Sequence, residues 1–158
     1  NFSQTGHLCM ATIHANNAYQ TIDRMVNMFD KDFQNQARLS LSSNLRAIVS
    51  QRLIPSKDGD LIMAQEIMLN EGLVKKLILD GKTTGIREIM EQNQKNGMCT
   101  FDQSILDLYR QGLIDEETAI KQSDQPGDMK IKIRQVELGE RGNMKNMDTS
   151  VLSLSDGD

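Results

Sequence analysis

The chain has 158 residues, of which 38% are hydrophobic and 25% are charged, and its formal net charge is -4. This composition is typical of one globular domain, and an acidic chain without tryptophan offers no basic surface or stacking platform, so we expect no nucleic-acid partner. No apolar run has the length that spans a bilayer, so we expect no direct membrane insertion. The two cysteines, Cys9 and Cys99, show no metal-ligand spacing and favour a reducing, cytoplasmic setting.

A strand is the first element that the sequence predicts. Residues 8–13 carry no charge, which is typical of a strand buried on both faces in a parallel sheet under helices. His14 then follows the carboxyl end of the strand, where ligands bind in open α/β sheets. His14 is therefore a candidate ligand contact, although a half-buried capping histidine without a function fits the same spacing. Cys9, inside the strand, is expected to be an inert core thiol.

Two helices are predicted to follow. Asn16 or Asn17 can act as the N-cap of a helix that runs to about Phe29, with apolar residues along one side. Apolar residues then recur at helical spacing from Phe33 to Val49, so we expect a second, longer helix there.

A β-hairpin is the next expected feature. Residues 51–55 and 61–68 are two apolar stretches, and they flank the turn signal Asp58-Gly59. The sheet is therefore expected to be partly antiparallel. Glu66, in the second strand, is interpreted as a solvated residue on the strand face rather than a general base.

Three short helices, each ended by a glycine, are predicted after the hairpin, and a short fourth helix follows them. Thr100 and Asp115 are the expected N-caps of the last two. The expected helical ranges are 73–79, 86–93, 101–110 and 116–121.

The predicted division of the chain has three parts. Residues 1–70 carry the strands, residues 71–124 form a helical subdomain, and residues 125–158 are expected to be a flexible tail, because they are rich in polar residues and glycine. The expected fold class is α/β with few strands, followed by a helical cluster.

Two motifs are rejected on their spacing. Gly81-Lys82-Thr83 ends like a phosphate-binding P-loop, but Lys76 stands where the motif needs glycine and a helix is expected before it. A helix C-cap followed by a surface lysine explains it better. His7 and His14 lack the spacing of a metal-binding pair, so we predict no metal site on them.

Residues 5–8, 11–18 and 21–26 closely resemble the histidine box of secretion and pilus ATPases, and most nearly that of pilus retraction ATPases of the PilT/PilU type. The resemblance covers about residues 5 to 133. The run over residues 73–80 departs from the Ala-Ile-Arg-Asn-Leu-Ile-Arg motif of the main retraction motor and favours the accessory, PilU-like member. The stretches that carry the resemblance are residues 5–8, 11–18, 21–26, 45–55, 66–70 and 97–103.

This resemblance implies the C-terminal portion of a RecA-like P-loop ATPase domain, which acts with ATP and Mg in a cytoplasmic hexamer or hetero-assembly. It also implies an inner-membrane pilus platform protein as a partner. His14 is then the expected contact to phosphate or to the catalytic water, with His7 and Thr12 as supporting candidates. Arg24 is either a structural salt-bridge partner, which we favour, or a residue that faces the nucleotide.

The sequence departs from the complete family pattern. It contains no P-loop and no acidic Walker B strand, and phosphoryl transfer needs both a phosphate cradle and an acidic group. Since Asn1 is not an initiator methionine, we expect the chain to be the C-terminal part of a longer ATPase. Alone, it is expected neither to bind ATP and Mg tightly nor to hydrolyse ATP. The alternative is a non-catalytic module that docks on a full-length motor.

Overall fold

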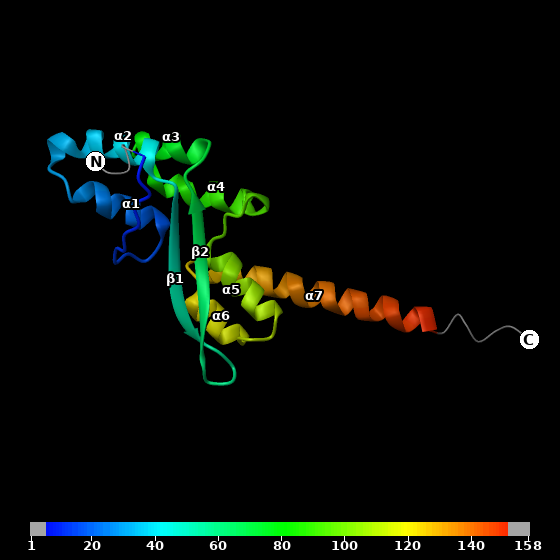
Figure 1. Ribbon diagram of the computed structural model, residues 1–158. Helices are drawn as coiled ribbons and strands as arrows, with labels where there is room; N and C mark the ends of the chain where they lie inside the picture. The colour runs from blue at the N-terminus through cyan, green and yellow to red at the C-terminus, as the bar shows by residue number, and fades with distance from the viewer. Residues whose placement is uncertain (1–5, 152–158) are drawn as a thin grey trace, which may run out of the picture. The chain divides into compact units, whose positions relative to one another are not determined.

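The computed structural model describes the backbone of residues 6–151 and the burial of residues 6–139. Helices follow the segment that carries His7 and His14, a β-hairpin comes next, and further helices come after the hairpin (Figure 1). The elements are α1 (Ala18–Asn27), η2 (Lys31–Phe33), α2 (Gln34–Asn44), β1 (Ala47–Pro55), β2 (Leu61–Leu69), α3 (Leu73–Leu79), η3 (Thr83–Gly85), α4 (Ile86–Gln92), η4 (Gln94–Asn96), α5 (Phe101–Arg110), α6 (Glu116–Gln122) and α7 (Pro126–Val151).

Helix α1 begins as the sequence predicts. The side chain of Asn17 accepts a hydrogen bond of 3.0 Å from the backbone N–H of Gln20, so Asn17 is the N-cap. Ile22 and Val26 lie one turn apart and are buried, which places one side of α1 in the core.

Helix α2 is shorter than predicted. It ends at Asn44, and residues 47–49 belong to β1 instead. The carbonyl of Arg46 accepts a hydrogen bond of 2.9 Å from the N–H of Asn70, and this extends the hairpin ladder. Arg46 and Asn70 are far apart along the chain, so the local helical spacing of the apolar residues did not indicate that they pair. The expectation of a helix to Val49 was wrong.

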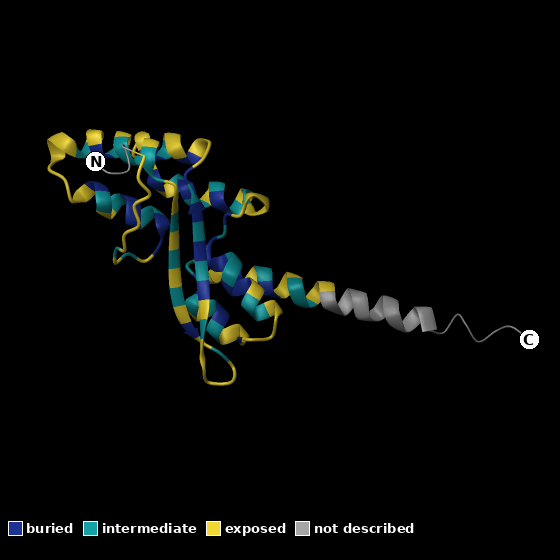
Figure 2. Ribbon diagram, viewed as in Figure 1, coloured by how far each residue is buried: buried dark blue, intermediate teal, exposed yellow. Residues whose placement is uncertain are grey.

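The hairpin is confirmed. Strands β1 and β2 pair into a two-stranded antiparallel sheet, and Gly59 in the turn has a φ of 88°, a conformation that glycine adopts without strain. Figure 2 shows exposed residues alternating along β1 with more buried ones. The combination of helices with this sheet agrees with the predicted α/β class.

The predicted opening strand is absent. Residues 7–15 form neither helix nor strand, and Leu8 and Met10 are 83% and 91% exposed. A strand buried on both faces needs neighbouring strands to pair with its backbone. Within residues 6–151 the sheet consists of β1 and β2 alone, so this segment has no ladder to join. Cys9 is exposed for the same reason, and the expectation of a core thiol was wrong.

The chain divides into two compact units, each described by itself. The first contains the described residues up to Leu53 together with Met63–Ser104, and α2 and α3 lie side by side in it. The second contains Ile54–Ile62 and the described residues from Ile105 onward. The boundaries at residues 70 and 124 stay a prediction. The apolar core of the first unit is built from Ala18, Ile22, Val26, Met68, Val74, Ile78, Ile86, Met90 and Met98.

The short helices after the hairpin are confirmed, and Asp115 caps α6 as expected. The tail differs from the prediction, because Pro126–Val151 form helix α7. Met129 and Ile133, one turn apart, are buried on it. The prediction used the average composition of this polar segment, which does not reveal two buried apolar residues on one side of a helix. Residues 152–158 of the predicted tail lie outside the described residues.

Candidate functional site

The sequence-predicted site residues lie on an exposed segment and on the helix that follows it. His7, Thr12 and His14 are all exposed on the segment before α1, and Arg24 is exposed on α1. Exposed imidazole and hydroxyl groups can donate hydrogen bonds to an anionic ligand. The segment therefore presents its polar side chains to solvent rather than to the core.

The start of α1 fixes the end of this segment in place. Asn17 is buried, and its carbonyl accepts hydrogen bonds from the backbone N–H of Thr21 at 3.0 Å and from the Thr21 hydroxyl at 2.9 Å. The N–H of Ala18 donates a hydrogen bond of 2.6 Å to Oε1 of Glu66 on β2. His14 is thus separated by only a few residues from a rigid point of the fold.

Glu66 was expected to be solvated, and the structure corrects this expectation. Its residue is 5% exposed, and its carboxylate lies at the N-terminus of α1. The first N–H groups of a helix have no partner within the helix, and the helix dipole favours a negative charge there. Sequence spacing alone does not show that the Glu66 carboxylate reaches the first N–H group of α1, so this role was missed.

Arg24 and His14 are brought together by a direct contact. Nη1 of Arg24 donates a hydrogen bond of 2.5 Å to the backbone carbonyl of His14. The contact uses the His14 backbone, and the residue itself stays exposed. The arrangement therefore places a guanidinium, with further N–H donors, close to an exposed histidine. These donors suit an anion such as phosphate.

A second contact from α1 reaches the segment after α3. Oδ1 of Asp23 accepts a hydrogen bond of 2.8 Å from the hydroxyl of the buried Thr83. No local pattern in the sequence indicates this pair, because the two residues are far apart along the chain. The rejection of Gly81-Lys82-Thr83 as a P-loop is confirmed, since helix α3 and not a strand precedes it.

No group of three or more histidine, cysteine, aspartate or glutamate side chains among the described residues could hold a metal ion. The described helices include none that is both long and apolar enough to cross a membrane.

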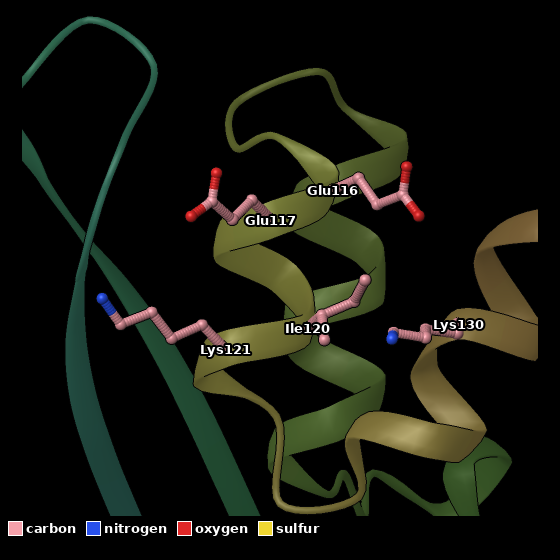
Figure 3. A pocket seen from close by; sticks show the side chains of 5 residues that line it. All are labelled: Glu116, Glu117, Ile120, Lys121 and Lys130. Atoms are coloured by element: carbon pink, nitrogen blue, oxygen red, sulfur yellow. The ribbon is translucent and has the colours of Figure 1, made fainter.

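A shallow surface hollow of about 480 Å³ lies between α6 and α7 in the second unit (Figure 3). Figure 3 shows Ile120 directed toward Lys130, with Glu117 and Lys121 on the other side of α6. The hollow contains none of the sequence-predicted site residues, and its charged groups have mixed signs. It therefore offers no concentrated charge for a ligand.

Solved structures with related folds include the pilus retraction motor PilT with bound ADP. It is 34% identical with a TM-score of 0.64 and covers 73% of this chain and 32% of that one. The ATPase DotB of Legionella pneumophila is 17% identical with a TM-score of 0.55 and covers 67% of this chain and 29% of that one, and this supports the fold alone.

Among curated relatives, the type IV pilus ATPase PilU of Pseudomonas aeruginosa is 38% identical over 98% of this chain and 40% of its own length. A twitching motility protein of Neisseria gonorrhoeae is 38% identical over 74% of this chain and 32% of its own. The chain therefore spans less than half the length of these relatives. The model of the Type II/IV secretion system protein family matches residues 1–137. This chain belongs to that family, and it resembles the pilus retraction ATPases within it.

Proposed function

We propose that this chain is the C-terminal part of a motor ATPase that powers type IV pilus retraction and twitching motility. The observation that carries the proposal is the similarity to a pilus ATPase along nearly the whole chain. A relative named for twitching motility and a retraction motor that binds ADP support the same reading.

In this proposal the nucleotide lies against the exposed segment before α1. His14 contacts the terminal phosphate or the attacking water, and His7 and Thr12 are supporting contacts. The residues suit a phosphate group, because the exposed histidine lies beside a guanidinium with N–H donors to spare. In the complete protein, bound Mg would supply positive charge that neutralises the phosphates. This chain's own residues bind and orient the phosphate end.

The proposed assembly is a homo-hexamer or a hetero-assembly with a pilus retraction ATPase. The complete protein acts with ATP and Mg in the cytoplasm, peripheral to the inner membrane, where a pilus platform protein is its partner. Within it, residues 1–70 complete the RecA-like core, and residues 71–124 form the helical subdomain.

A non-catalytic docking module is the second candidate, and one observation favours it. Leu8 and Met10 expose almost their whole side chains to solvent, and such residues often mark a surface that another protein covers. Under this reading the chain joins a full-length motor and hydrolyses nothing itself. The test is purification of the 158-residue chain with a full-length retraction motor, with Leu8→Ser and Met10→Ser as the variants expected to lose binding.

The retraction function is tested with the full-length protein that contains this chain. We expect it to hydrolyse ATP and to restore twitching in a strain that lacks its own copy. A matched control is Lys95→Ala, because Lys95 is exposed in η4 and outside the proposed site. A full-length protein that hydrolyses no ATP and restores no movement would contradict the proposal.

A further inference from the structure

The backbone around His14 has few ties to the fold. Residues 7–15 form no helix or strand, and Ile13 and Ala15, on either side of His14, are only half-buried. A side chain on such a segment samples many positions unless its backbone is held. The hydrogen bond from Arg24 to the His14 carbonyl is therefore a contact that can fix where His14 lies.

Helix α1 is a firm support for this contact. Ile22 and Val26 anchor it in the core, Glu66 binds its first N–H group, and Thr83 binds Asp23, the neighbour of Arg24. The base of the Arg24 side chain is therefore held in place by contacts on several sides of the helix.

The geometry of a helix explains why Arg24 can reach back to His14. Side chains on an α-helix tilt toward its N-terminus, and Arg24 lies about 9 Å along the axis from Ala18. The short stretch between His14 and α1 could otherwise extend about 10 Å away from the helix. The hydrogen bond instead keeps His14 within reach of the second turn of α1.

We propose that Arg24 is a positioning residue for His14: its guanidinium holds the His14 backbone against α1, so that the imidazole meets the phosphate in one orientation. This inference rests on the proposed function, in which His14 acts at the nucleotide. Within the described part of the chain no carboxylate forms an ion pair with Arg24, so its charge is not committed to a structural salt bridge.

The first test is a double-mutant cycle in the full-length ATPase, with Arg24→Ala, His14→Ala and both together. We expect Arg24→Ala alone to lower kcat by about tenfold or more with little change in KM, because a small misplacement of a catalytic group slows the reaction strongly. In the His14→Ala background the same change has less than about a twofold effect, because Arg24 acts through His14. Arg24→Lys restores part of the activity, since an ammonium also donates to a carbonyl.

Equal losses of kcat from Arg24→Ala in both backgrounds would overturn the proposal, because Arg24 would then act on its own. Arg110→Ala is the matched control, since Arg110 is an exposed helical arginine whose bond to Asp107 lies in the second unit. We expect this variant to keep its kcat.

The second test does not depend on activity. In the 158-residue chain, NMR order parameters of the backbone N–H groups of His14 and Ala15 should fall from about 0.85 to below about 0.6 in Arg24→Ala. They should stay unchanged in Arg110→Ala. Unchanged values in Arg24→Ala would overturn the proposal. If the values fall while His14→Ala leaves kcat intact, the positioning contact stands and the catalytic role of His14 is the part that fails.

Discussion

Arg87 on α4 and Asp102 on α5 form an ion pair with Nη2 and Oδ2 2.6 Å apart, in which the Asp102 side chain is only 1% exposed. Asp102→Ala removes this charge-assisted contact, while Arg87 keeps its second ion pair with Glu91 at 3.2 Å, so we expect the free energy of unfolding to fall by about 1.5–3 kcal/mol. Urea unfolding followed by circular dichroism measures this. Asp107→Ala breaks the exposed pair with Arg110 and should cost less than about 1 kcal/mol. Equal effects of the two variants would contradict this expectation.

The hydrogen bond between Glu66 and Ala18 is expected to stabilise the fold. Glu66→Ala leaves the Ala18 N–H buried without its acceptor, and we expect a loss of about 2 kcal/mol in the free energy of unfolding. Glu66→Gln keeps an oxygen at this place and should cost less. Glu71→Ala serves as the control, because Glu71 is exposed. If the glutamine and alanine variants lose the same stability, the hydrogen bond is not the source of the effect.

Asn70 closes the C-terminal end of α2. Its Nδ2 donates hydrogen bonds to the carbonyls of Ser42 at 3.0 Å and Leu45 at 2.9 Å, and the residue is buried. Asn70→Ala removes these donors and should cost about 1–3 kcal/mol. Asn70→Asp should cost at least about 1 kcal/mol more, because it directs a negative charge at carbonyl oxygens where a helix end already disfavours anions.

The comparison between the two Asn70 variants is the informative measurement, again by urea unfolding. Asn96→Asp, at an exposed site in η4, controls for the added charge and should change the stability little. An aspartate variant more stable than the alanine variant would show that the site does not require a donor.

The Asp115 cap is expected to make the stability that it gives to α6 depend on pH. The backbone N–H of Thr118 donates a hydrogen bond of 2.8 Å to Oδ1 and lowers the pKa of the Asp115 carboxyl below its ordinary value. The folded chain therefore holds this proton less tightly than the unfolded chain does. The stabilisation is present in full above the unfolded pKa, and it is lost as the pH falls through the lowered pKa of the folded state.

The stability difference between the wild type and Asp115→Asn should accordingly shrink as the medium is acidified. Chemical unfolding over a series of acidic pH values measures this difference, and an NMR titration of the carboxyl carbon reports the pKa directly. A difference that stays constant with pH would contradict the capping role of the charged form.

Local signals in the sequence predicted the elements that depend on local contacts. Asn17 marked the start of α1 because an amide side chain caps the N–H groups of the residues that follow it. Asp58-Gly59 marked the hairpin because Gly59 takes a positive φ at low cost. Contacts between residues that are close in the sequence can be predicted from local sequence patterns in this way.

Contacts between residues that are far apart in the sequence could not be predicted from it. The pairing of Arg46 with Asn70 pulled residues 47–49 into β1, although their spacing also suited a helix. The apolar run over residues 8–13 suggested a buried strand, but a run of this kind becomes a strand only where other strands pair with it. His14 and Arg24 were both singled out from the sequence, whereas the hydrogen bond between them depends on how the chain folds back before α1.

The most direct test of the central claim is the kcat of ATP hydrolysis by the full-length protein with His14→Ala, measured beside Lys95→Ala as the control. Loss of a preorganised contact to the reacting phosphate typically slows turnover by about 100-fold or more, and we predict a loss of that size. The control should keep the wild-type rate. A His14→Ala protein that turns over ATP within about twofold of the wild type would contradict the account, because the removal of this contact should cost far more.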